Sequence, residues 1–481
     1  MLKTNFKKSI TAIIILISIA TVTYFIINSN AGNLTSQSDD LTTNVVDSIA
    51  PNDPSILNPS ITTVTPSVTQ VVTKNPTIID AQNYNLDITG RTDTSAQLQT
   101  MMDSLPKGVS IKLPKGTYKI VSIVKLKDNI TIIASNDVIF RGVAYNTLFS
   151  TGNNNIFQGI SFQNCATALR VFHKNGLEVI NCRFTSNIKF SAINFYGASD
   201  SSVINSYFAG IRKYGILIDN DSSDITIDNN NFDNAEVFGG YKKEQIGGHV
   251  YCLNGTNIKV TNNILKNSGG QGVIFGYNST TGKGTTNSVA SNNKCEGNGQ
   301  EGATIYGGSK KVTSGNSIIN NTSKNNRFNQ IEVWQSNNNI VRGNTVAESI
   351  TGIGNLGAIC LFDTAGTTVT GNNILSAQNN GIAIIAGTTN TTVSDNYIAD
   401  TNKKNDINTP EMGNGILLDW NGKSDPKYIT ITSNVISSSS AIIDKSGVYS
   451  TSKSNHNNEI NNNIITGYTY GVNWYALLTC G

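Results

Sequence analysis

Eight residues carry side chains whose types would suit a shared chemistry. Four could act as acids or bases, namely Asp219, His249, Glu332 and Asp363. Four more are expected to hold a ligand, namely Tyr251, Tyr306, Trp334 and Asp419. Carboxyl and imidazole groups transfer protons, whereas Tyr and Trp rings pack against the apolar C–H faces of a sugar.

The spacing of these groups decides which reaction is open to them. Cleavage of a glycosidic bond needs two carboxyl groups beside one oxygen, ~5 Å apart for retention and ~6.5–9.5 Å apart for inversion of configuration. Elimination at a uronate instead needs a base and a cation that neutralises the uronate carboxylate.

Two series of short strands repeat along the chain. The first usually opens with Gly: YGILID (214–219), QGVIFG (271–276), EGATIY (301–306), NQIEVW (329–334), GAICLF (357–362), NGIAII (380–385), NGILLD (414–419) and YGVNWY (470–475). The second usually has Asn at its fourth position: VINCRF (179–184), VINSYF (203–208), IDNNNF (227–232), VTNNIL (260–265), ASNNKC (290–295), TSGNSI (313–318), VRGNTV (341–346), VTGNNI (369–374), VSDNYI (393–398), ITSNVI (431–436) and INNNII (460–465). Their length, period-two alternation and β-branched residues are typical of strands.

Such repeats indicate a solenoid, because one coil cannot bury its apolar face alone and stacked coils place each repeat position in a column. The predicted Asn column, bonded amide to amide at ~4.8 Å, is Asn230, Asn263, Asn293, Asn316, Asn344, Asn372, Asn396, Asn434 and Asn463. The predicted buried stack is Phe184, Phe208, Phe232, Leu265, Cys295, Ile318, Val346, Ile374, Ile398, Ile436 and Ile465.

Residues two and four after Gly are expected on the outer face of the coils, because strand side chains alternate. The first outward column is Leu217, Ile274, Thr304, Glu332, Ile359, Ala383, Leu417 and Asn473, and the second is Asp219, Gly276, Tyr306, Trp334, Leu361, Ile385, Asp419 and Tyr475. His249 and Tyr251 join this face if Val250 and Cys252 face inward, and a one-residue shift reverses that assignment.

Glu332 is the best single candidate for a general acid, since the apolar bulk of Trp334 would raise the pKa of its carboxyl. Asp363 is a partner only if the chain turns back after its strand. Asp219 lies four coils from Glu332, ~19 Å, which is too far for one bond.

A second cluster would suit a polysaccharide lyase. Asp219, His249 and Tyr251 fall on adjacent coils, with Lys213 nearby to neutralise a uronate. This alternative and the hydrolase remain open from the residues alone.

The columns of NN-I and G-I-x-I resemble the right-handed parallel β-helix of the pectate lyase-like superfamily. The stretch 81–120 is similar to the first segment of its secreted members, with a capping helix beginning at DTSAQ (93–97) and a strand motif at PKGTY (114–118). The resemblance implies an all-β, right-handed parallel β-helix of about twelve or more coils with an N-terminal capping helix. It also implies a polysaccharide lyase or glycoside hydrolase whose substrate lies on the outer sheet face.

The motifs of particular enzymes are missing. The polygalacturonase set, the W-x-D-H of pectate lyases and the Asp-Pro-His of alginate epimerases do not occur, and Gly247-Gly248-His249 is no substitute. No P-loop, HExxH, CxxC pair or EF-hand loop is present, so no cofactor or metal site is predicted. Calcium is left open because no motif indicates it.

The N-terminal region predicts export. Lys3, Lys7 and Lys8 precede an uncharged apolar run from Ile10 to Ile27. Residues 1–31 are therefore interpreted as a signal peptide or signal anchor, residues 32–76 as a disordered Ser/Thr/Pro-rich stalk, and residues 77–481 as the β-helix domain.

Charge excludes some partners. The net charge of +3 comes from the N-terminal lysines, so nucleic acid is not expected as a partner and the membrane only through the N-terminal segment. The hypothesis is a secreted or membrane-anchored cell-surface enzyme that cleaves glycosidic bonds of a polysaccharide. The alternative is a noncatalytic carbohydrate-binding or adhesin-like protein on a stalk.

Overall fold

The computed structural model describes residues 77–233, 247–348, 356–403, 405–406, 408–421, 424–452 and 455–474. They belong to one compact unit, Thr77–Gly481. The predicted export segment and stalk lie outside the described residues and stay predictions. Among the described residues no helix is both long and apolar enough to cross a membrane.

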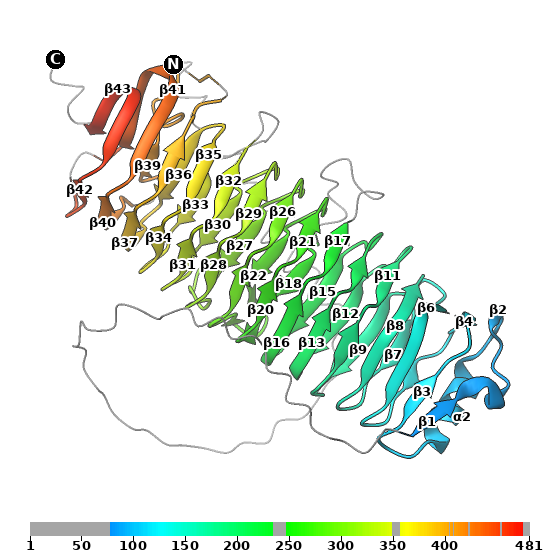
Figure 1. Ribbon diagram of the computed structural model, residues 1–481. Helices are drawn as coiled ribbons and strands as arrows, with labels where there is room; N and C mark the ends of the chain where they lie inside the picture. Colours follow the sequence, from blue (N-terminus) through cyan, green and yellow to red (C-terminus); the bar gives the residue numbers. More distant parts are fainter. Residues whose placement is uncertain are drawn as a thin grey trace, which may run out of the picture. The chain divides into compact units, whose positions relative to one another are not determined.

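The unit is a stack of coils built from parallel strands (Figure 1). Three faces run along it, here called sheets one, two and three. Most coils contribute one strand to each face, and these strands pair in parallel with their counterparts on the neighbouring coils.

Sheet one contains β5 (Val124–Lys125), β7 (Thr147–Ser150), β9 (Thr167–Phe172), β12 (Ser191–Tyr196), β15 (Tyr214–Asp219), β18 (Val250–Cys252), β22 (Val273–Phe275), β27 (Ala303–Tyr306), β30 (Ile331–Trp334), β33 (Gly357–Phe362), β36 (Asn380–Ile385) and β39 (Ile416–Asp419). These twelve strands, with the ends of β41 and β43 beyond them, match the expectation of twelve or more coils.

Sheet two contains β1 (Ile78–Asp80), β3 (Ser110–Lys112), β10 (Glu178–Ile180), β13 (Ser199–Ile204), β16 (Ser222–Asp228), β19 (Gly255–Thr256), β20 (Lys259–Thr261), β25 (Val289–Ser291), β28 (Ser317–Ile319), β31 (Ile340–Arg342), β34 (Thr368–Thr370), β37 (Thr389–Ser394), β40 (Lys427–Thr432) and β42 (Glu459–Asn461).

Sheet three contains β2 (Thr89–Asp93), β4 (Gly116–Lys119), β11 (Arg183–Thr185), β14 (Tyr207–Phe208), β17 (Asn231–Asp233), β21 (Ile264–Lys266), β26 (Lys294–Glu296), β29 (Thr322–Lys324), β32 (Thr345–Ala347), β35 (Asn373–Ser376) and β38 (Tyr397–Ala399). Four longer strands pass from one sheet to another: β6 (Thr131–Arg141), β8 (Ile156–Gln163), β41 (Val435–Ser450) and β43 (Ile464–Trp474).

The first coils are closed by a helix, as the sequence predicts. After a 3-10 turn, η1 (Ala81–Tyr84), helix α2 (Ser95–Ser104) buries Leu98, Met101 and Met102 against the core. The N-cap position is Thr94, and the carboxylate of the preceding Asp93 accepts the Ser95 N–H at 3.0 Å. The helix covers an apolar stack that would otherwise meet water at the end of the solenoid.

The Asn column forms with one correction. Each Asn donates its side-chain N–H to the next Asn Oδ1, from Asn230 through to Asn463. Asn321, and not Asn316, stands between Asn293 and Asn344. Asn316 belongs to a neighbouring ladder on sheet two, where its backbone N–H donates to Asn339 Oδ1 at 3.1 Å.

The same five-residue shift moves Ile318 out of the predicted stack. Ile318 is buried between Ala290 and Val341 of sheet two, and Ser323 follows Cys295 in sheet three. The sequence contains both alignments because Asn316 and Asn321 are each followed two residues later by a residue that faces the core. Only the inter-coil pairing distinguishes them.

Candidate functional site

Glu332 lies on the outer side of sheet one, at the middle of the stack. Its strand, β30, places Ile331 and Val333 in the core, so Glu332 and Trp334 point away from it. Thr304 of β27 is the register partner of Glu332 on one side and Cys360 of β33 on the other. This confirms the predicted outward direction of Glu332.

The strand register of the next coil was predicted wrongly. Glu332 pairs with Cys360 and Trp334 with Phe362, so Ile359 and Leu361 face the core. In GAICLF the glycine begins the strand one residue earlier than in NGIAII, since Gly357 pairs with Asn380. A one-residue shift exchanges the two faces of a strand.

A second carboxyl group, Glu301, joins Glu332. Ala303 pairs with Ile331, so the register places Glu301 beside Asn329. Asn329 in turn donates from its Nδ2 to Glu332 Oε1 at 3.0 Å. The negative charge of Glu301 acts on Glu332 through space and raises the pKa of the Glu332 carboxyl.

The turn before β30 explains this arrangement. Gln330 is fully buried. Its Oε1 accepts one hydrogen bond from the backbone N–H of Asn326 at 3.1 Å and a second from the side-chain Nδ2 of Asn326 at 2.7 Å. With Gln330 facing inward, Asn329 lies on the same side as Glu332, three residues further on. The chain bend thus brings the side chains of Glu301, Asn329 and Glu332 together.

Both carboxyl groups are buried. Glu332 is 7% and Glu301 8% exposed. Burial, and then the charge of Glu301, raises the pKa of Glu332 well above its usual range. Burial raises the pKa of Glu301 to about 7. The pair therefore holds at least one proton near neutral pH, as a general acid must.

Amide groups orient the two carboxyls. Gln271 Nε2 donates to Glu301 Oε2 at 3.2 Å, and Asn329 Nδ2 bonds Glu332 as described. Both amides are nearly buried, so they hold the acids in place with little competition from water.

Aromatic rings line the same face beside Glu332. Tyr306 lies edge-on to Tyr277 at 5.4 Å and to Trp334 at 6.2 Å between ring centroids, and Trp334 stacks on Phe362 at 4.3 Å. Tyr306 and Trp334 remain partly exposed. They are the outward aromatic pair that the sequence predicts.

Tyr251 stands in the same outward column as Glu332, three coils before it. It points outward as predicted but is only 3% exposed, and its ring packs on Tyr214 at 4.9 Å. The charge of Glu301 contributes to raising the pKa of Tyr251, after burial and the two tyrosines Tyr214 and Tyr306. Tyr251 is therefore a buried neighbour of Glu301.

The outer face becomes apolar beyond β30. A buried cluster there contains Cys360, Phe362, Ala383, Ile385, Ala386, Leu417 and Tyr449. The described polar groups that surround Glu332 thus come from the strands β27 and β30 and the residues that precede β22, β27 and β30.

His249 does not lie on the outer face, which corrects the expectation. Val250 pairs with Ile216, so His249 occupies the column of Gly215 at the corner before the strand. A Cβ at Gly215 would meet the ring of Phe232, which shows that this column points into the core. His249 is 1% exposed, burial lowers its pKa to about 4, and its Nε2 is bonded to Lys266 O.

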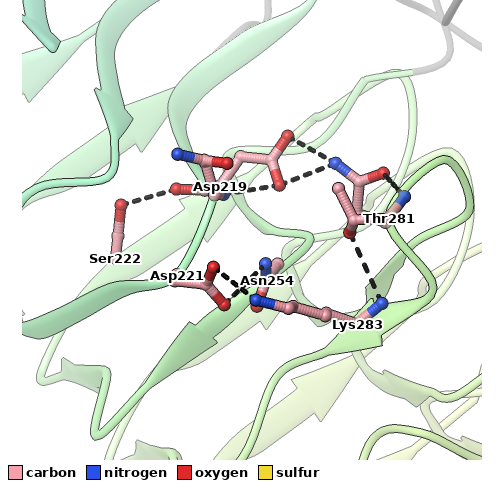
Figure 2. Close-up of polar contacts among 8 residues, drawn as sticks. Asp219, Asp221, Ser222, Asn254, Thr281 and Lys283 are labelled. Carbon is pink, nitrogen blue, oxygen red and sulfur yellow. Dashed lines mark hydrogen bonds and ion pairs between the residues drawn. The ribbon is translucent and has the colours of Figure 1, made fainter. Parts of the chain in front are cut away.

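Asp219 lies on the outer face but anchors a hairpin, β23 (Tyr277–Asn278) with β24 (Lys283–Gly284) (Figure 2). Asn278 Nδ2 lies 3.0 Å from each Asp219 carboxylate oxygen, and Lys283 Nζ forms an ion pair with Asp221 at 2.8 Å. Burial raises the pKa of Asp219. The predicted cluster of Asp219 with His249 does not assemble, because His249 points into the core.

Asp363 is not brought to Glu332 either. It follows β33 with a left-handed backbone (φ 51°), and its carboxylate forms an ion pair with Lys311 at 2.8 Å. Its register neighbour is Gln335, three residues past Glu332. The turn directs the acid toward Lys311 and not back along the sheet.

Asp419 closes β39, three coils after Glu332. Burial raises the pKa of its carboxyl, and Thr451 Oγ1 donates to its Oδ1 at 2.6 Å. Neighbouring Trp420 is half exposed. Asp419 is the register partner of Ile385, so it lies beside the apolar cluster and three coils from Glu332.

Glu301 was missed because only the residues two and four after the glycine were assigned to the outer face. The first position of the repeats holds Glu301 in EGATIY (301–306) and Asn329 in NQIEVW (329–334). The strings therefore align the acid with Asn329 one coil apart, but the first position was given no direction.

In the ranges that the structure describes, no group of three or more His, Cys, Asp or Glu side chains is placed to hold a metal ion. The five described cysteines (Cys165, Cys182, Cys252, Cys295 and Cys360) are buried and free.

Comparison with known proteins agrees on the fold. No curated protein matches the sequence. The surface adhesin PfbA of Streptococcus pneumoniae has a similar structure with a TM-score of 0.54 and 16% identity, over 74% of this chain and 100% of that chain. The tailspike protein of E. coli bacteriophage HK620, solved with a pentasaccharide, has a TM-score of 0.57 and 10% identity, over 83% of this chain and 78% of that one. Identities this low show the fold alone.

A family model settles the membership. The model described as right handed beta helix region matches residues 124–286 and 281–476, which together are most of the chain. This agrees with the predicted all-β solenoid and with the resemblance to the pectate lyase-like superfamily. The chain belongs to the right-handed parallel β-helix family.

Proposed function

We propose that the protein is an extracytoplasmic enzyme that hydrolyses glycosidic bonds of a polysaccharide on the outer face of sheet one. The observation that supports this most is the buried pair Glu301 and Glu332, whose raised pKa values provide a proton near neutral pH. Partly exposed Tyr306 and Trp334 adjoin the pair and offer rings for a sugar.

The two acids take different roles. Glu332, whose proton is held by burial and by the neighbouring charge, donates to the glycosidic oxygen as the bond breaks. Glu301, with a pKa of about 7, is the carboxylate that assists the attack of water at the anomeric carbon. Gln271 and Asn329 orient the two groups through their amide N–H bonds.

A lyase is less well supported. His249 is enclosed in the core and Asp219 is bonded to Asn278, so neither is a free base at the outer face. The Lys213 amine lies 5.0 Å from the ring of Tyr214, and burial lowers its pKa, which weakens its use as a cation for a uronate. Asp219, His249 and Asp363 are therefore left out of the mechanism.

Export rests on the sequence. The basic and apolar N-terminus supports secretion or anchoring at the cell surface, with residues 32–76 as a stalk. Trypsin treatment of intact cells tests this proposal, since a surface protein is removed and a cytoplasmic control is not.

The activity test uses a panel of glycans and a reducing-end assay. The wild-type chain should release reducing ends without the ultraviolet absorbance of an unsaturated product. Glu332→Gln and Glu301→Gln should each lower turnover by ~10²-fold or more. The matched control is Glu178→Gln, an exposed glutamate on β10 of sheet two, which should keep full activity.

Three results would count against the proposal. Full turnover in Glu332→Gln removes that group from the mechanism. An unsaturated product indicates a lyase. A wild-type chain that binds glycans and cleaves none of them is the noncatalytic adhesin-like protein of the alternative hypothesis.

A further inference from the structure

Three buried oxygen atoms next to the acid pair have no hydrogen-bond partner among the described residues. They are Thr304 Oγ1, Gln271 Oε1 and Asn329 Oδ1. The three residues are between 3% and 8% exposed. A buried polar atom left without a partner is unfavourable by about 1–3 kcal/mol, so three around one pair of carboxyls indicate a site prepared for a ligand.

The chemistry of these atoms limits what can bind. Each amide already uses its nitrogen on a carboxyl, Gln271 on Glu301 and Asn329 on Glu332. The remaining carbonyl oxygens can only accept hydrogen bonds. Thr304, the register partner of Glu332, adds a hydroxyl oxygen. A ligand that satisfies these atoms must present donors, which in a carbohydrate are hydroxyl groups.

Charge limits the ligand further. Neither Glu301 nor Glu332 takes part in an ion pair with any lysine, arginine or histidine of the described ranges. A uronate would bring a third carboxylate, which is acceptor-only, beside this buried pair and its unpaired acceptor oxygens. Like charges held close together repel strongly when water is excluded.

We infer that this site takes an uncharged, hydroxyl-bearing stretch of polysaccharide and rejects uronate residues. The inference rests on the proposed function, since it names the substrate class of the same acid pair. It separates this chain from a β-helix enzyme that needs a uronate carboxylate for its chemistry.

The test compares ligands that differ only in charge. Uronic oligosaccharides are prepared as free acids and as their carboxyl-reduced, neutral counterparts, and binding is measured by calorimetry at pH 8. Glu332→Gln is used because it cannot donate the proton and leaves the ligand intact, while it keeps the Glu301 carboxylate. The neutral forms should bind at least about tenfold more tightly than the acids.

A second variant ties the preference to the acid. In the double variant Glu301→Gln, Glu332→Gln both carboxyls become neutral amides of the same shape, so the preference should shrink to less than about threefold. Thermal melting shows that each variant is folded. If the double variant keeps the full preference, the charge of Glu301 is not its origin and the inference fails.

Other outcomes separate the inference from the function. Acids that bind as tightly as neutral glycans, or wild-type hydrolysis of uronates, overturn the inference and leave the glycosidase standing. Tighter binding of ammonium-bearing amino sugars than of neutral sugars also overturns it. Neutral glycans that bind the wild type and are never cleaved overturn the proposed function alone. Glycans that bind to no variant overturn both.

Discussion

Replacing Glu301 by Gln should change how the stability of the protein depends on pH. Burial raises the pKa of Glu301 from its ordinary 4.5 to about 7. Between these values the folded state holds a proton that the unfolded chain has released, so the free energy of unfolding falls as pH rises. The interval corresponds to about 3 kcal/mol, at about 1.4 kcal/mol for each pH unit.

The raised pKa of Glu301 fixes the sign of the pH dependence of stability. The stabilising contribution of protonated Glu301 is complete below pH 4.5 and is lost as the pH passes 7. Glu301→Gln has no proton to lose, so the variant should lack this part of the slope. Above pH 7 the variant should be the more stable protein, because its amide oxygen can still accept the bond from Gln271 Nε2 while no buried charge forms.

Urea unfolding at pH 4.5, 6 and 7.5 measures the effect, followed by tryptophan fluorescence because Trp334 adjoins the site. Wild type should lose about 3 kcal/mol more than Glu301→Gln across this range. The control is Glu178→Gln, whose curve should parallel that of wild type because this glutamate is exposed on β10. Tyr251, Tyr306 and Cys360 near the pair stay protonated throughout, since their pKa values are also raised.

Parallel curves for wild type and Glu301→Gln would refute the reasoning. They would mean that Glu301 is hydrated and titrates like a surface carboxyl. Glu301 would then be ionised at neutral pH and would hold no proton for the acid pair.

Three further predictions concern single side chains. Trp334→Ala should raise KM several-fold with little change in kcat, because it removes a ring and no proton, whereas the exposed Trp420→Ala should change neither. Ile374→Asp places a charge in the fully buried stack and should lower the free energy of unfolding by several kcal/mol in urea titration. The control is Leu375→Asp, which should cost under about 1 kcal/mol because Leu375 on the same strand is 41% exposed. Asn372→Ala leaves the Asn344 N–H groups without their acceptor and should cost about 2–4 kcal/mol in the same titration; a loss below 0.5 kcal/mol would show that the ladder contributes little.

The repeats predict most of the fold because the same demand recurs on every coil. Ile374, Ile398 and Ile436 occupy one position of the repeat, and each faces a core that neighbouring coils complete. The Asn column follows from the same logic, since a buried amide needs a partner and the next coil supplies it. The alignment failed at TSGNSI (313–318), where two asparagines five residues apart both fit the pattern.

The site was predicted in part. Glu332, Tyr306 and Trp334 were placed on the outer face because strict alternation holds within β27 and β30. His249 and Glu301 lie at the corners before their strands, where alternation no longer applies. There the backbone bends, and the direction of a side chain depends on the space left by the facing sheet, such as that beside Phe232.

The sequence by itself determined the coil, its apolar columns and the outward residues in the middle of each strand, because a period of two and stacking between coils are local and repeated. The tertiary structure alone decided which acids are neighbours. Glu301 and Glu332 are 31 residues apart in the chain, and they meet because inward-facing Gln330 bends the corner and places Asn329 between them. Burial, which raises their pKa values, is likewise a property of the packed coils and not of either residue.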